Sequence, residues 1–145
     1  MARGYPDYFG QSMWPKYGTP IEVDLLETDI PHGEELDVVS ILGQGILFNL
    51  KATLVETEAS NNAYLDLYVD GTLMATISQV YSQYDNPMTA IGEVLVPIYR
   101  SINYGELIVG LTREVPFRYT LIVKARNLSR GMLNCSGKVH YYVVT

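Results

Sequence analysis

Few side chains in this 145-residue sequence are of the types that perform catalysis, and their spacing matches no common catalytic or metal-binding motif. The sequence has two histidines, His32 and His140, and a single cysteine, Cys135. The histidines form no His-x-His or His-x-x-x-His pair, and one cysteine adds no zinc-ligand spacing. The segment 134–137 (Asn-Cys-Ser-Gly) is typical of a turn, which disfavours Cys135 as a nucleophile paired with histidine. We therefore expect no enzyme activity, no cofactor and no metal centre.

Carboxylates are the next candidates for chemistry. Acidic residues are dense between residues 22 and 37, and oxygen-rich loops can bind calcium. The Asp-x-Asp-x-Asp-Gly spacing of a helix–loop–helix calcium site is absent, so a solvated rim or a partner-facing patch is the favoured interpretation. Asp66 and Asp70 are predicted to lie on the outer face of one strand, where two carboxylates could act as a glycosidase pair. Exposed acids at a sheet edge are the simpler explanation.

Tyrosines predicted to point outward form a further candidate site. Flat rings on a β-sandwich can stack on sugars, so these tyrosines could make a glycan platform. Tyrosine is also a good strand former and is common in protein interfaces. We favour the structural role and keep carbohydrate binding as the alternative. The platform residues are Tyr64, Tyr68, Tyr81 and Tyr84, with Tyr99 and Tyr104 as further exposed rings.

The elements that would position these residues are predicted β-strands. Hydrophobic residues alternate with polar ones in many runs, and no window of helical length shows a 3.6-residue period. Asp70-Gly71 joins two alternating runs and predicts a tight hairpin. The alternation places Ile46 and Phe48 inward with Leu50, and Tyr119 inward with Leu121. The predicted strands cover residues 21–28, 36–42, 46–57, 63–69, 72–78, 91–99, 106–111, 117–125 and 139–144.

These runs predict an all-β fold, an antiparallel two-sheet β-sandwich that is jelly-roll-like. Residues 21–145 form the predicted single β-sandwich domain, and residues 1–20 form an extended arm. Five of the sixteen aromatic residues lie in the arm, among three glycines and three prolines and without any period. Such a segment cannot build its own core, so we expect it to cover its own body or a neighbouring subunit. The predicted interface residues are Tyr5, Tyr8, Phe9, Trp14 and Tyr17.

Composition and charge set further limits. Hydrophobic content of 48% and a mean hydropathy of +0.06 are typical of a globular protein, and no apolar run reaches the ~18 residues of a membrane span. We expect no secretory signal, so Asn127-Leu128-Ser129 is interpreted as a chance match to a glycosylation acceptor. The net charge of −6 makes nucleic acid an unfavourable partner.

The charges are distributed unevenly along the chain. Residues 1–99 carry three basic and fourteen acidic residues, whereas residues 100–145 carry seven basic and two acidic residues. The favoured interpretation is that acidic and basic strands lie side by side and neutralise each other. The alternative is that the two ends of the body differ in sign, so that copies could stack head to tail or form a ring.

Three stretches carry a resemblance to a known class. They are Gly43–Phe48 (Gly-Gln-Gly-Ile-Leu-Phe), residues 65–73 (Leu-Asp-Leu-Tyr-Val-Asp-Gly-Thr-Leu) and the tyrosine-rich end at His140-Tyr141-Tyr142. Over about residues 40–145 the sequence resembles small β-sandwich virion proteins of tailed phages, which are head-decoration or tail-associated components. The openings Tyr5–Gly10 and Trp14–Gly18 also resemble a phage structural arm. The resemblance implies a structural or adaptor role and transfers no catalytic residues.

The leading hypothesis is therefore a non-enzymatic virion structural protein that assembles through its arm and its β-sandwich surface. Capsid decoration or stabilisation and a tail-associated position both fit. The expected partners are further copies, as a trimer or ring, and other virion proteins, with no nucleic acid and no membrane. The expected location is the virion, and otherwise the cytoplasm of the infected host cell. The alternative is a carbohydrate- or receptor-binding module that uses its exposed tyrosines, with a glycan as its ligand.

Overall fold

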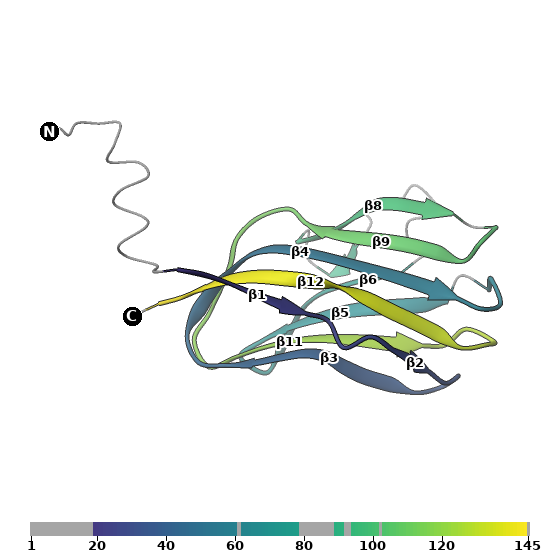
Figure 1. Cartoon of the computed structure of the whole chain (residues 1–145), viewed down its shortest axis with the longest axis horizontal. Helices are drawn as coiled ribbons and strands as arrows, with labels where there is room; N and C mark the ends of the chain where they lie inside the picture. Colours follow the sequence, from purple (N-terminus) through teal and green to yellow (C-terminus); the bar gives the residue numbers. More distant parts are fainter. Residues whose placement is uncertain (1–18, 61, 79–88, 92–93, 102, 145) are drawn as a thin grey trace, which may run out of the picture.

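The computed structural model describes residues 19–60, 62–78, 89–91, 94–101 and 103–144. In these residues every regular element is a β-strand, and the strands form two antiparallel sheets that pack face to face (Figure 1). The described part of the chain contains no helix long and apolar enough to cross a membrane. The prediction of an all-β, antiparallel two-sheet sandwich is confirmed. The arm residues Tyr5, Tyr8, Phe9, Trp14 and Tyr17 lie outside the described residues.

The two sheets differ in size. The seven-stranded sheet has the order β1-β12-β4-β9-β8, with β2 paired to β12 and β10 paired to β4. Its strands are β1 (Pro20–Asp24), β2 (Thr28–Ile30), β4 (Gly45–Glu56), β8 (Leu95–Ser101), β9 (Glu106–Leu111), β10 (Val115–Phe117) and β12 (Leu133–Val143). The five-stranded sheet has the order β3-β11-β5-β6-β7. Its strands are β3 (Glu35–Leu42), β5 (Ala63–Val69), β6 (Thr72–Ser78), β7 (Thr89–Ile91) and β11 (Thr120–Asn127).

The strand pairs are nested in the sequence, which identifies the topology as a jelly roll. The hairpin β5–β6 is innermost, and around it β4 pairs with β9, β3 with β11, and β1 with β12. The chain therefore behaves as one long hairpin that is wrapped so that successive pairs fall in alternate sheets. Two interleaved Greek keys of this kind define the jelly roll. The fold brings the start of β1 and the end of β12 side by side (Figure 1).

The core lies between the sheets and draws side chains from both. Alternate residues of each strand point inward, which is the period expected for strands with one buried face. Burial of a large aliphatic side chain is worth about 1.5–3 kcal/mol, so this cluster supplies the main stabilising term. Every member lies between Leu25 and Val139. The largest fully buried side chains are Ile30, Leu47, Leu50, Leu54, Leu65, Leu67, Ile77, Leu95, Leu107, Leu121 and Leu133.

A β-bulge near the start of β4 reverses which of its first residues point into the core. His140 of β12 pairs with Asn49, but the next residue, Tyr141, pairs with Leu47, so Phe48 is the extra residue. Leu47 is consequently fully buried, while Ile46 and Phe48 are half-buried on the outer face. The prediction that Ile46 and Phe48 point inward was wrong because simple alternation cannot register an inserted residue.

Three further local predictions were wrong because the turns lie at other positions than the sequence indicated. Tyr119 is 67% exposed because β10 ends at Phe117 and β11 begins at Thr120, so the predicted strand 117–125 is broken by a turn. Cys135 lies inside β12 and is fully buried, not in a turn, and burial raises the pKa of its thiol to about 12. The predicted strand 21–28 is divided between β1 and β2.

Gly137 explains how a turn-like sequence continues as a strand. Its φ is +135°, and a Cβ built on it would collide with the carbonyl oxygen of Lys51 and lie 3.0 Å from the Cα of Ala52. Glycine therefore allows β12 to approach β4 closely at this point. Gly43 also has a positive φ, +122°, but nothing lies within 4 Å of its would-be Cβ.

This contrast predicts that Gly137→Ala destabilises the protein far more than Gly43→Ala. Gly43→Ala should cost about 1–2 kcal/mol, the strain of its φ alone. Gly137→Ala should cost at least about 2 kcal/mol more, because the two central strands must separate. Urea unfolding of both variants measures the difference. Equal costs would show that the close approach at Gly137 does not matter.

Candidate functional site

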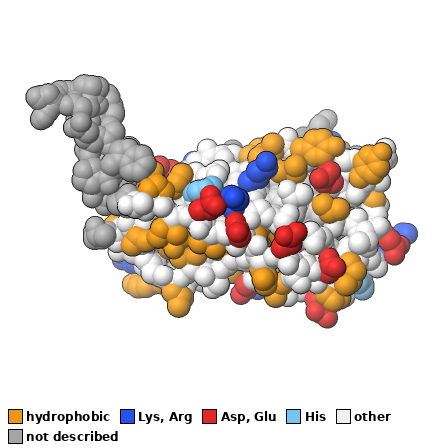
Figure 2. Space-filling model, viewed as in Figure 1, with side chains coloured by type: hydrophobic (Ala, Val, Ile, Leu, Met, Phe, Trp, Pro, Cys, Tyr) orange, Lys and Arg blue, Asp and Glu red, His pale blue; other side chains and the backbone are white. Residues whose placement is uncertain are grey.

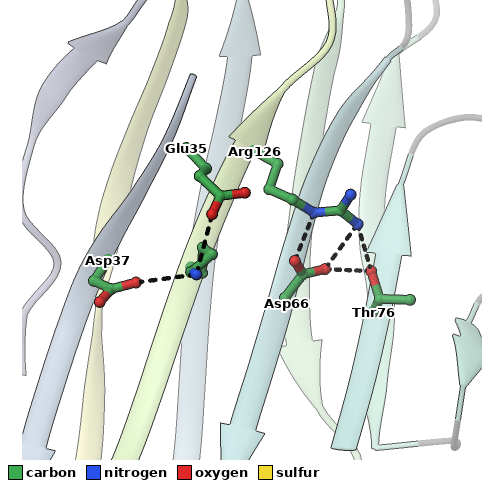
Figure 3. Close-up of polar contacts among 6 residues, drawn as sticks. Glu35, Asp37, Asp66, Thr76 and Arg126 are labelled. Carbon is green, nitrogen blue, oxygen red and sulfur yellow. Dashed lines mark hydrogen bonds and ion pairs between the residues drawn. The ribbon is translucent and has the colours of Figure 1, made fainter. Parts of the chain in front are cut away.

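The outer face of the five-stranded sheet carries a buried ion pair (Figure 3). The Asp66 side chain is only 2% exposed, and its Oδ2 lies 2.6 Å from Arg126 Nε. Arg126 Nη2 also donates to Asp66 Oδ1 at 3.1 Å, and Thr76 Oγ1 donates to the same oxygen at 2.5 Å. Asp66 stands directly opposite Lys124 in the ladder, so its bond to Arg126 is a diagonal one.

This geometry corrects the prediction for the two candidate carboxylates. Asp66 points to the outer face, but it is buried and neutralised by Arg126, and β5 is an interior strand between β11 and β6. Asp70 lies in the β5–β6 turn and binds backbone amide groups instead. The two carboxylates therefore have separate structural roles and do not form a glycosidase pair.

Acidic and basic strands pair across both sheets, which confirms the favoured interpretation of the uneven charge. The antiparallel pairing places β3 beside β11 and β1 beside β12. These partly exposed pairs each contribute little stability. Among the described residues no group of three or more His, Cys, Asp and Glu side chains is placed to hold a metal ion. The contacts are Lys124 with Glu35 (3.2 Å) and Asp37 (3.8 Å), Lys138 with Glu22 (3.2 Å) and Asp24 (4.0 Å), and His140 with Glu22 (2.9 Å).

The two described tyrosines of the predicted glycan platform lie on β5 and flank Asp66. Both are half-buried, and each carries a cation over its ring. The guanidinium carbon of Arg126 lies 4.5 Å from the Tyr64 ring centroid, and Lys124 Nζ lies 5.2 Å from the Tyr68 centroid. Cations at this distance are attracted by the ring face. The rings of Tyr64 and Tyr68 thus pack against the cations of β11. Tyr81 and Tyr84 lie outside the described residues.

One end of the sandwich collects several chain reversals, and we call it the arm-proximal end. It is where the described chain starts, at Thr19 and Pro20 (Figure 1). Backbone hydrogen bonds join its parts: Gly43 N donates to Tyr119 O, Asp70 N to Thr120 O, and Val144 N to Gln44 O. Large hydrophobic side chains are exposed here, with Leu42 at 83%, Tyr119 at 67% and Val143 at 40%.

Asp70 holds the arm-proximal end together. The predicted tight hairpin is confirmed, with φ of 53° at Asp70 and 85° at Gly71. The Asp70 carboxylate accepts hydrogen bonds from the backbone N–H groups of Arg118 (3.0 Å), Tyr119 (2.6 Å) and Thr120 (3.1 Å). These bonds, the one from Tyr119 foremost, lower the pKa of Asp70. The carboxylate therefore fixes the β10–β11 turn that displays Tyr119.

Beside this end, the outer face of the seven-stranded sheet carries a cluster that we call the outer aromatic patch: Ile46, Phe48 and Tyr142. Phe48 and Tyr142 stack with centroids 4.4 Å apart and an interplanar angle of 24°. Ile46 pairs directly with Tyr142 across the ladder, and Pro20 pairs with Tyr142 on the other side. Figure 2 shows hydrophobic side chains gathered at this end of the face, near histidine and acidic side chains. The sequence did not indicate this patch, because it depends on the bulge at Phe48.

The loops at the opposite end are occupied by structural hydrogen bonds. Asn127 is buried; its side-chain amide donates to Ile30 O and Gly131 O, and its oxygen accepts from Ser129 N. A buried Asn127 cannot accept a glycan, in keeping with the chance-match interpretation. A shallow polar depression of about 290 Å³ is lined by Glu58, Ala59, Ser60 and Arg130, where Ser60 Oγ donates to the Glu56 carboxylate.

Both histidines make hydrogen bonds to neighbouring segments of the body. His32 contacts the carbonyl oxygen of Ser129 through Nδ1, and His140 lies between Asn49 and Glu22 on the outer face. Hydrogen bonds from His140 and Lys138 lower the pKa of Glu22. These contacts are typical of residues that stabilise loops and sheet surfaces.

No family model matches the chain, and no curated protein matches its sequence. Among solved structures, it is similar to the acid-stable capsid of Helicobacter pylori bacteriophage KHP30, with a TM-score of 0.43 and 8% identity over 88% of this chain and 95% of that chain. It is also similar to the capsid of Ralstonia phage GP4, with a TM-score of 0.43 and 12% identity over 88% and 84% of the two chains.

A third similar structure is the VP2 subviral particle of infectious bursal disease virus, with a TM-score of 0.41 and 13% identity over 86% of this chain and 33% of that chain. These three structures are phage and viral capsids or capsid-like particles. With TM-scores below 0.5 and identities of at most 13%, the likeness concerns the overall fold alone.

The buried ion pair predicts a large difference between two cations on the same strand. Arg126→Met leaves the Asp66 carboxylate buried without its partner and should cost about 2–3 kcal/mol. Lys124→Met removes only partly exposed pairs and should cost less than about 1 kcal/mol. Both substitutions keep an aliphatic stem over the neighbouring tyrosine. Chemical denaturation measures both costs, and adding Asp66→Asn to Arg126→Met should recover part of the loss. Similar costs for the two single variants would contradict the assignment.

Asp70 predicts a specific loss of stability in acid. Its pKa is lowered in the folded protein, so its contribution is present above the unfolded value near 3.8 and is lost as the pH falls through the folded value. Asp70→Asn should therefore lower stability at pH 7 and flatten the decline below about pH 4. Asp24→Asn, at an exposed carboxylate that faces Lys138, is the matched control. Unfolding midpoints from pH 2 to 7 measure the effect; an unchanged acid profile in Asp70→Asn would refute the role.

Proposed function

We propose that this protein is a non-enzymatic structural component of a virion that assembles with further copies and with other virion proteins. Its aromatic arm and the surface of its β-sandwich provide the contacts. Within the virion, the protein either decorates or stabilises the capsid or is associated with the tail. The assembled form is a trimer or a closed ring. The sequence resemblance to small virion proteins of tailed phages supports this proposal.

The observation that carries the proposal is that the described body closes its core without the arm. All members of the core cluster lie between Leu25 and Val139, and many have no exposed surface. The five aromatic residues between Tyr5 and Tyr17 are therefore not needed to fill it. Burial of each ring on another surface would be worth about 1.5–3 kcal/mol. Pro6 and Pro15 reduce the entropy that the free arm loses on docking.

The described residues also favour binding over catalysis. Most charged side chains of the two sheets are paired across strands, and the histidines and the cysteine hold structural positions. The exposed groups at the arm-proximal end include large hydrophobic side chains, Leu42 and Tyr119, beside the exposed Arg118. Exposed hydrophobic groups gathered at one place are typical of protein interaction surfaces.

Carbohydrate binding has less support. The described platform tyrosines, Tyr64 and Tyr68, each have a cation over the ring, which competes with a sugar for that face. They also lie on either side of a buried ion pair rather than along an open groove. A glycan-binding role for the predicted tyrosines stays a prediction.

Removal of residues 1–18 tests the proposal, because β1 begins only at Pro20 and the core is left intact. The truncated protein should keep its β-sheet circular dichroism and its unfolding free energy within about 1 kcal/mol. We expect light scattering to show an oligomer for the full chain and a monomer for the truncated protein. A full-length variant with its five arm aromatics replaced by serine serves as the matched control. A truncated protein that still assembles fully would refute the role of the arm.

A further inference from the structure

The outer aromatic patch lies immediately beside the point where the arm joins the body. Pro20 pairs with Tyr142, and Tyr142 pairs with Ile46 on the next strand. Phe48 stacks on Tyr142, so the three side chains form one apolar surface across β12 and β4. Two strand spacings of about 4.8 Å place Ile46 about 10 Å from Pro20, and Phe48 follows two residues later on β4.

The side chains of the patch are hydrophobic on a face where the neighbouring residues are polar. Asn49, Lys51, Lys138 and His140 share this face, and Glu22 on β1 contacts both His140 and Lys138. The ion pairs at the rim form within the chain, so they surround an apolar patch on a polar face. Such a patch suits aromatic and proline side chains, which bury large areas at low entropic cost.

The arm supplies side chains of this kind, and it is long enough to carry them to a second copy. Phe9 lies eleven residues before Pro20, and eleven extended residues span about 36–40 Å. This reach is several times the distance from Pro20 to its own patch, so the distal rings Tyr5, Tyr8 and Phe9 can extend past their own body to a second copy.

We infer that the distal arm segment 5–9 (Tyr-Pro-Asp-Tyr-Phe) of one copy docks on the outer aromatic patch of a second copy. Each molecule then gives one arm and receives another, which produces either a reciprocal dimer or a closed ring. Stacked or edge-to-face contacts with Phe48 and Tyr142 provide the recognition. The inference rests on the proposed function and specifies the surface that receives the arm.

A complementation experiment with two full-length variants tests this inference. Phe48→Ser removes the receiving surface, and the double substitution Tyr8→Ser/Phe9→Ser removes the docking segment. Each variant alone should run near the monomer mass of 16.3 kDa in light scattering, at concentrations where the unmodified chain is oligomeric. An equimolar mixture should form a heterodimer of about twice that mass, because one variant keeps the patch and the other keeps the arm.

Controls separate the possible failures. Ile98→Ser, at a 59% exposed position on β8 of the same sheet, should assemble normally. Should Phe48→Ser lose its β-sheet circular dichroism, Ile46→Ser takes its place. If the mixture stays monomeric, the arm binds its own body and docking between copies is wrong. If the arm variant is monomeric but Phe48→Ser assembles, the receiving surface lies elsewhere while the proposed function survives. If deletion of residues 1–18 also leaves assembly intact, both proposals fail.

Discussion

The structure depends above all on the ladder between β12 and β4. These two strands lie at the centre of the seven-stranded sheet, and through β12 the last strand of the fold holds β1, the first. Two features set the geometry of this ladder. Gly137 allows the backbones to come close, and the bulge at Phe48 changes which side chains face inward. The ladder therefore governs both the closure of the core and the composition of the outer face.

Cross-strand charge pairing has a second consequence for the surface. A jelly roll places early strands beside late ones, so the acidic residues of β1 and β3 meet the basic residues of β12 and β11. The ion pairs on the surface contribute little to stability. Because the paired charges neutralise each other, they attract a distant partner less strongly than unpaired charges would. Short-range contacts, including those of apolar groups, therefore carry more of the recognition. This argument favours assembly by packing over long-range electrostatic steering.

Alternation and turn signals predicted the fold class and most strands, because period 2 and Asp-Gly are set by the local backbone. The predictions fail where a single residue changes the inward–outward alternation of a strand or the position at which a strand begins or ends. The bulge at Phe48, the turn at Tyr119 and the strand through Cys135 each depend on contacts with a partner strand that no local window contains. Asp66 was placed on the correct face, but its burial follows from Arg126, sixty residues later. For the candidate site, the composition of the sequence was enough to indicate the arm. The neighbouring outer aromatic patch could not be predicted, because it depends on the pairing register of β12 and β4.

The bulge also links fold to function in a physical way. With regular pairing, Ile46 and Phe48 would point into the core beside Leu50; the inserted residue sends them outward and puts Leu47 in their place. The core loses nothing, since Leu47 is fully buried, yet the outer face gains an isoleucine and a phenylalanine next to Tyr142. Because both side chains are half-buried already, their complete burial by a partner would return about half of the 1.5–3 kcal/mol that a fully exposed side chain gains. A one-residue insertion can thus move core-type residues to the outer face, close to the point where the described body begins.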